Sequence, residues 1–117
     1  MKQNTLLSFS AFLAAANAKC DPSAIQAALP SGASVNFARP VAANATFEVP
    51  KSQTGYPTSP KNLPSLCAVS VQVQSIGNTT YGFGMFLPDD WNGRFWAVGN
   101  GGFAGGINYL DMVCKNQ

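Results

Sequence analysis

The stretch CAVSVQVQSI (residues 67–76) alternates small apolar side chains with serine or glutamine. Alternation with a period of two is typical of a strand that has one buried face. GNTT (77–80) supplies turn residues, and YGFGMFLP (81–88) alternates again. Two alternating runs joined by a short turn predict an antiparallel β-hairpin with a half-buried first strand.

The segments after this hairpin predict a turn and a third strand. DDWNG (89–93) has the composition of a tight turn, in which Asp and Asn side chains accept hydrogen bonds from their own backbone. RFWAVG (94–99) is a short apolar run without alternation, which favours a strand buried on both faces. INYLDMVCKNQ (107–117) has the composition of a segment in which a helix begins.

The segments before the hairpin are less regular. DPSAIQAAL (21–29) predicts a short helix, with Asp21 as its N-cap and Pro22 in its first turn. VNFARPVA (35–42) is weakly extended. PKSQTGYPTSPKNLP (50–64) contains four prolines and few apolar residues, which indicates a loop on the surface.

This order of elements favours the α/β class. Strands as apolar as these need cover on both faces, and the helices that would provide it are not found among these 117 residues. We therefore interpret the chain as the amino-terminal part of a larger α/β domain, incomplete by itself.

The amino terminus predicts a secretory signal peptide over residues 1–18. A basic start at Lys2 precedes the apolar run 6–16, and small residues at Ala16 and Ala18 fit cleavage after Ala18. The alternatives are a buried helix and a membrane anchor, but the run is shorter than the roughly 20 residues that span a bilayer. We expect a secreted domain over residues 19–117 and no membrane association.

A secretory route favours disulfide bonds between the cysteines, of which there are three: Cys20, Cys67 and Cys114. We expect Cys20 to pair with Cys67, because this bond ties the terminus to the first hairpin strand and could stabilise the fold by about 4 kcal/mol. Cys114 is then left unpaired. The sequons at Asn44 and Asn78 are candidate glycosylation sites.

Charge and composition exclude several functions for this chain alone. The net charge is +2 with a tenth of the residues charged, and no basic stripe suggests a nucleic-acid partner. The sequence contains no histidine, so a Ser-His-Asp centre cannot be assembled from it. No spacing of cysteines and carboxylates suggests a zinc site.

Aromatic residues are concentrated in the second half of the chain. We interpret six of them as core residues, since alternation directs most of them inward. The alternative is that they form a sugar-binding face on a small secreted binding or structural module that folds alone. The six residues are Phe83, Phe86, Trp91, Phe95, Trp96 and Phe103.

AVGNGGFAGG (97–106) contains five glycines and has three interpretations. GNGGFA (99–104) matches a dinucleotide-binding fingerprint, but the expected acidic residue would lie beyond residue 117. Glycines also suit a structural turn after a strand. The third interpretation is an oxyanion hole, in which bare backbone N–H groups approach an ester carbonyl. Glycine content alone does not decide between the last two.

LPDDWNGRFWAVGNGGFAGGINYLDM (87–112) resembles the amino-terminal signature of the fungal tannase and feruloyl esterase family, and the resemblance extends to Cys20 with the helix after it, to 29–42 and to 63–73. It implies a secreted serine esterase with an α/β-hydrolase core and an inserted lid that holds calcium. It implies phenolic ester substrates of the galloyl, feruloyl or coumaroyl kind, and the pairing of Cys20 with Cys67.

Few functional residues transfer from the family to this chain. Gly101 and Gly102 in the matching loop are candidate oxyanion-hole donors, but the nucleophile, the rest of the triad and the calcium ligands have no counterpart. Ser70 and Ser75 do not lie in a G-x-S-x-G elbow. The resemblance ends after Met112, so we expect a truncated product or fragment that is inactive alone.

Overall fold

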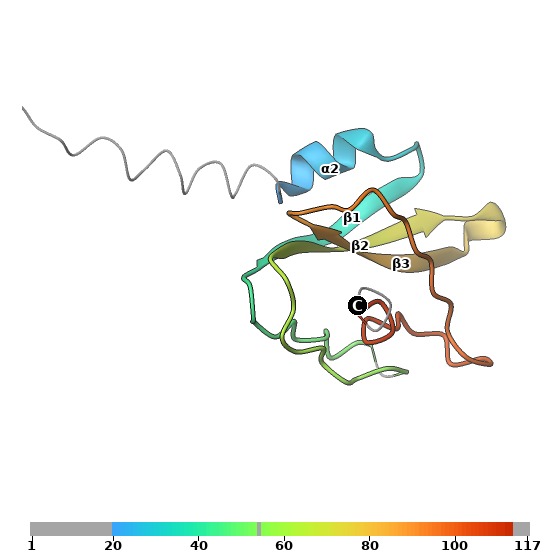
Figure 1. Ribbon diagram of the computed structural model, residues 1–117. Coiled ribbons are helices and arrows are strands. Elements are labelled where there is room, and N and C mark those ends of the chain that lie inside the picture. The colour runs from blue at the N-terminus through green and yellow to red at the C-terminus, as the bar shows by residue number, and fades with distance from the viewer. Residues whose placement is uncertain (1–19, 54, 114–117) are drawn as a thin grey trace, which may run out of the picture.

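The computed structural model describes residues 20–53 and 55–113, and its described elements form one small sheet with a helix against it (Figure 1). In chain order they are α2 (Pro22–Ala28), β1 (Ala33–Val41), β2 (Leu66–Gln74), the 3-10 turn η1 (Ile76–Asn78) and β3 (Thr80–Pro88). Both pairings in the sheet are antiparallel, and β2 lies between β1 and β3. The predicted hairpin is confirmed as β2 and β3.

The predicted helix is confirmed as α2. The Asp21 side chain caps it by accepting a hydrogen bond from the Ser23 N–H at 2.9 Å, and Pro22 occupies its first turn. Gln26 then joins the helix to the edge strand β1. Its Nε2 donates to the Ala33 carbonyl at 2.9 Å, and its Oε1 accepts the Val35 N–H at 2.8 Å. These bonds satisfy backbone groups that an edge strand would otherwise expose.

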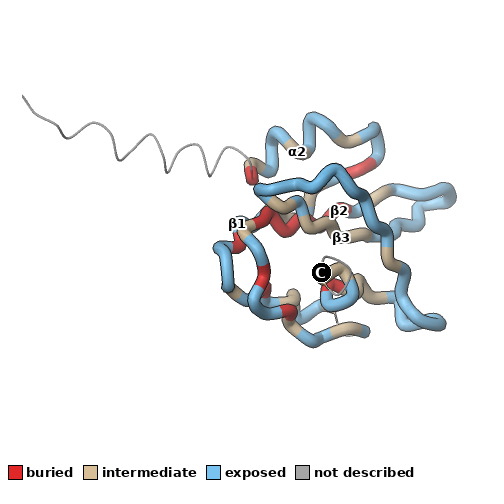
Figure 2. Tube along the Cα trace, viewed as in Figure 1, coloured by how far each residue is buried: buried red, intermediate tan, exposed pale blue. Residues whose placement is uncertain are grey.

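The central strand β2 is buried on both faces over its first six residues, from Leu66 to Val71. The prediction of a half-buried strand is therefore wrong there. Val69 and Val71 pack on the α2 side with Ile25 and Leu29. Leu66 and Ala68 face the other side, where segments of the loops from 42 to 64 and from 107 to 113 cover the sheet (Figures 1 and 2).

Aromatic rings fill the core on this second side. The Phe47 ring lies 4.9 Å from the Tyr109 ring and 5.6 Å from the Phe86 ring, centre to centre. Leu63, from the proline-rich stretch, is 1% exposed within the same core. The described residues of that stretch form no helix or strand, as predicted. Leu63 nevertheless belongs to the core, because the loop folds under β2 where the sheet needs cover.

The segment 94–99 forms no strand, contrary to the prediction. It has no ladder partner among the described residues, and Phe95 and Trp96 are 84% and 60% exposed. Figure 2 shows the chain after β3 as mostly exposed. An apolar run becomes a buried strand only where a neighbouring strand pairs with it, and no described segment pairs with the outer edge of β3.

Four of the six aromatic residues that we interpreted as core residues are exposed: Trp91, Phe95, Trp96 and Phe103. Phe83 and Phe86 are partly buried as expected. The turn at 89–93 is confirmed, since Asn92 Oδ1 accepts the Arg94 N–H at 3.0 Å. Residues 107–113 form turns and no helix in the part of the chain that the structure describes.

Candidate functional site

The glycine-rich loop (97–106) begins within the exposed segment 94–99 and reaches the lower side of the sheet (Figure 1). Gly102 and Gly105 adopt φ of +57° and +72°, which only glycine tolerates easily. The loop is closed at its ends, because the Asn100 Nδ2 donates to the Gly106 carbonyl at 3.3 Å. The glycines are thus needed for the loop's own conformation, whatever else the loop does.

The two candidate oxyanion donors differ in their surroundings. The Gly101 N–H donates to the Tyr56 hydroxyl at 2.6 Å. The Gly102 N–H has no hydrogen-bond acceptor among the described residues. Of the two amides, only that of Gly102 is therefore available to an external oxygen in this conformation. Whether the loop serves as an oxyanion hole stays a prediction.

Two side chains of the proline-rich stretch, Gln53 and Tyr56, hold this loop in place. Besides the Tyr56 contact, the Gln53 Oε1 accepts the Ile107 N–H at 3.0 Å. Sequence reasoning missed both side chains, because a contact between two loops leaves no periodic pattern. One hint of this contact was present in the sequence: Gln53 and Tyr56 lie in a stretch that is otherwise rich in proline and small polar residues.

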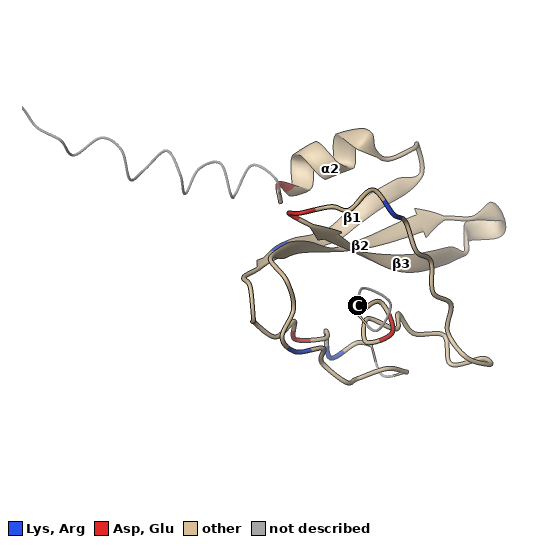
Figure 3. Cartoon of the chain, in the orientation of Figure 1, with Lys and Arg blue, Asp and Glu red and all other residues tan. Residues whose placement is uncertain are grey.

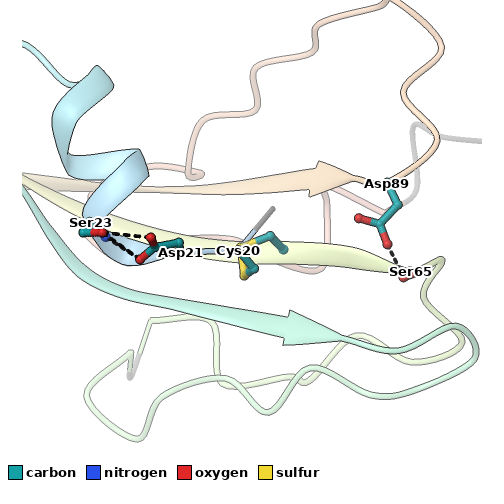
Figure 4. The surroundings of a disulfide bond; sticks show 6 residues. Cys20, Asp21, Ser23, Ser65 and Asp89 are labelled. Carbon is teal, nitrogen blue, oxygen red and sulfur yellow. Dashed lines mark hydrogen bonds between the residues drawn. A yellow bond between two sulfur atoms is a disulfide. The ribbon is translucent and has the colours of Figure 1, made fainter. Parts of the chain in front are cut away.

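The structure confirms the predicted disulfide between Cys20 and Cys67 (Figure 4). A cleft of about 340 Å³ lies beside it and is lined mostly by apolar atoms. At its rim the Ser65 hydroxyl donates to Asp89 Oδ2 at 2.5 Å, and the Asp89 N–H donates to the Ser65 carbonyl at 3.0 Å. This pair fastens the start of β2 to the end of β3.

The Ser65–Asp89 pair has no histidine beside it that this sequence could supply. A serine becomes a nucleophile when a base such as histidine takes its proton, and this sequence contains no histidine. Ser70, which the sequence placed in a strand, is 4% exposed and accepts a hydrogen bond from Asn36 Nδ2 at 3.2 Å. Ser75 is exposed next to η1.

Charged side chains are few and scattered over the described residues (Figure 3). The Ser23 hydroxyl and then the Ser23 N–H lower the pKa of Asp21, which is the carboxylate that caps α2. No three His, Cys, Asp or Glu side chains of the described residues lie together in a way that could hold a metal ion. The calcium that the resemblance implies for the lid of the full-length family stays a prediction.

Among the described residues, Tyr109 is the ionisable side chain buried in the core on the second side of the sheet. Its ring is fully buried, and its hydroxyl has no hydrogen-bond partner within the described ranges. Burial raises the pKa of Tyr109, and the nearby Ser70 hydroxyl and the charge of Arg39 offset this only in part. Ser70 is near enough to favour the phenolate but does not reach hydrogen-bonding geometry. The Tyr109 ring packs against Phe47 and Phe86.

The candidate glycosylation sites lie where a glycan could be attached. Asn44 and Asn78 are exposed and adopt φ of +63° and +61° in turns. Glycosylation stays a prediction. The signal peptide (1–18) and Cys114 lie outside the described residues. No helix in the described part of the chain has the length and apolar character needed to cross a bilayer.

Three fungal proteins illustrate what the chain is similar to. It is 34% identical to probable feruloyl esterase B-2 of Aspergillus terreus over 98 residues, which are 82% of the chain. It is 29% identical over 80 residues, or 68% of the chain, to probable feruloyl esterase B-1 of Aspergillus flavus. It is 37% identical over 51 residues, or 44% of the chain, to feruloyl esterase C of Talaromyces stipitatus.

The matched segments span only 18%, 15% and 10% of these relatives, respectively. No protein-family model matches the chain. No solved structure matches it significantly. The similarities support a family of ester hydrolases of the feruloyl esterase type.

Proposed function

We propose that the chain forms the amino-terminal part of a secreted carboxylic ester hydrolase of the feruloyl esterase and tannase type, with an α/β-hydrolase core. The observation that carries this proposal is the 34% identity over 98 residues to the Aspergillus terreus protein. The disulfide between Cys20 and Cys67 supports a secretory route, since such bonds persist in oxidising compartments.

The proposed substrates are esters of phenolic acids, with feruloyl, coumaroyl or galloyl groups. In an esterase of this kind a serine attacks the ester carbonyl, and the tetrahedral intermediate carries a negative charge on oxygen. Fixed backbone N–H groups stabilise that charge because their dipoles need no reorientation during the reaction. We propose that this chain provides such an N–H from its glycine-rich loop, and that its three-stranded sheet supports that loop.

A chimera tests this function. Residues of this chain replace the matched segment of the Aspergillus terreus relative, and hydrolysis of methyl ferulate and methyl gallate is measured against the unmodified relative. We expect the chimera to keep activity that a serine-directed inhibitor abolishes. The Gly102→Val variant of the chimera, which places a side chain at a φ of +57°, should lose most of it.

The matched control is Gly93→Val, at a glycine with a φ of +78° that also lies outside the sheet and has open space around it. It imposes a similar backbone strain away from the glycine-rich loop. The proposal fails if the chimera folds without esterase activity, or if both valine variants lose activity equally.

The second candidate is a small secreted module that binds carbohydrate or serves as a structural unit. The exposed rings of Trp91 and Trp96, at 65% and 60%, favour it, because exposed aromatic faces can stack on sugar rings. Titration of the 117-residue chain with soluble arabinoxylan, followed by tryptophan fluorescence, tests this candidate. Saturable quenching that Trp96→Ala abolishes would favour the module over the esterase segment.

A further inference from the structure

The glycine-rich loop is hydrogen-bonded to a second segment, which contributes Gln53, Gly55 and Tyr56. The Tyr56 hydroxyl accepts the Gly101 N–H at 2.6 Å, across 45 residues of sequence. The Gln53 Oε1 accepts the Ile107 N–H at 3.0 Å. Two side chains from one segment therefore hold the loop at its middle and just after its end.

The backbones of the two segments also approach closely at a pair of glycines. A Cβ atom on Gly55 would lie 2.9 Å from the Ala104 carbonyl oxygen and 3.3 Å from the Gly106 nitrogen. A Cβ atom on Gly106 would lie 3.2 Å from Cδ2 of Tyr56. A side chain at Gly55 would push the segments apart, so this contact requires glycine there and sets the distance at which Tyr56 meets the loop.

The Tyr56 contact distinguishes two neighbouring amides. The Gly101 N–H is engaged by the hydroxyl, whereas the Gly102 N–H has no acceptor among the described residues and belongs to a residue with a φ of +57°. A fixed loop conformation in which the Gly102 N–H is not taken up by a described residue is what a preorganised donor needs.

We propose that Tyr56 is a positioning residue for the glycine-rich loop: its hydroxyl takes up the Gly101 N–H and leaves the Gly102 N–H as the donor that the loop offers to an ester oxyanion. This inference rests on the proposed function for the role of the donor. The contact between Tyr56 and Gly101 does not depend on that function, so the two are tested separately.

Solvent-exchange NMR on the ¹⁵N-labelled 117-residue chain tests the contact. In the unmodified protein we expect the Gly101 amide proton to exchange about tenfold more slowly than that of Gly102, the factor set by one net hydrogen bond. In Tyr56→Phe the Gly101 amide should exchange as fast as that of Gly102, and its proton resonance should move upfield. Amides in β2 report whether the sheet stays folded.

Two variants serve as controls. Tyr81→Phe removes the hydroxyl of an exposed tyrosine in β3 and should leave the Gly101 amide unchanged. Gln53→Ala should release the Ile107 amide and affect Gly101 less than Tyr56→Phe does. Equal exchange of Gly101 and Gly102 in the unmodified chain overturns the proposal even if Tyr56→Phe does not fold.

The catalytic consequence is read from the chimera. In an active chimera, Tyr56→Phe is expected to lower kcat for methyl ferulate about tenfold with little change in KM, because the donor is needed in the transition state more than in the ground state. An unchanged kcat overturns the positioning role. An inactive chimera refutes the proposed function, while the exchange data still decide whether Tyr56 fixes the loop.

Discussion

Gly84 in β3 lies directly against the ring of Tyr109, which belongs to a segment 25 residues further along the chain. A Cβ atom on Gly84 would be 2.6 Å from Cε1 of Tyr109 and 2.9 Å from Cγ2 of Ile107. No real side chain approaches that closely. The bare backbone at Gly84 is therefore what allows the segment after the glycine-rich loop to pack on the sheet.

Gly84→Ala is expected to destabilise the fold by about 1–3 kcal/mol, the usual cost of forcing extra volume into a packed site. The matched control is Gly82→Ala in the same strand, where the nearest atom to the new Cβ is the Val71 carbonyl oxygen at 3.4 Å. That change should be neutral or slightly stabilising. Urea unfolding measures both. Equal stability of the two variants would mean that Tyr109 does not pack on β3.

Tyr109→Phe is expected to stabilise the fold at neutral pH by about 1 kcal/mol. The hydroxyl is buried and has no hydrogen-bond partner among the described residues, so its removal relieves a desolvation cost without losing a bond. The ring contacts with Phe47 and Phe86 remain. Thermal and urea unfolding of the variant and the parent at pH 7 check this. A loss of stability would show that the hydroxyl is hydrogen-bonded in solution.

Tyr109 also gives the stability a dependence on alkaline pH. Burial raises the pKa of Tyr109 above its ordinary value of 10.0. The unfolded chain therefore releases this proton before the folded chain does, and the free energy of unfolding falls as the pH rises above 10.0. Below that value the contribution is fully present.

Urea unfolding from pH 8 to 11 measures this fall. It should be smaller in Tyr109→Phe than in the parent, and it should persist in Tyr81→Phe, whose hydroxyl belongs to a side chain that is 57% exposed. Parallel curves for the parent and Tyr109→Phe would contradict the assignment.

Local patterns in the sequence predicted the parts of the fold that local patterns determine. The hairpin follows from alternation in β2 and β3, and α2 follows from the Asp21 cap and Pro22. The apolar run at 94–99 was assigned wrongly, because burial of a strand depends on a partner that the run itself does not specify.

The candidate site was predicted only in part. Glycine content identified the loop, but it did not reveal that Tyr56 engages the Gly101 amide from 45 residues away. The burial of Tyr109 was equally out of reach, since one aromatic residue in an irregular segment has no period. Long-range contacts between loops are fixed by the folded sheet that brings the loops together.

Loss of the Cys20–Cys67 bond is expected to destabilise the chain by about 4 kcal/mol, because the bond closes a loop with a sequence separation of 47. The double variant Cys20→Ala, Cys67→Ala measures this in thermal unfolding. Cys114→Ser is the control and should keep the bond, as peptide mapping by mass spectrometry under non-reducing conditions would show. Detection of a peptide that links Cys114 to either partner would contradict the pairing.

A polypeptide of residues 19–117 is expected to hydrolyse neither methyl ferulate nor methyl gallate above the rate in buffer. An oxyanion donor such as the Gly102 N–H lowers the barrier only when a nucleophile attacks, and a serine needs a base to become one. The sequence contains no histidine to act as that base. Product release is measured by chromatography, with the Aspergillus terreus relative as the positive control. Turnover that a serine-directed inhibitor abolishes would show that one of this chain's own serines is activated by another group, and the Ser65–Asp89 pair would then be the first to mutate.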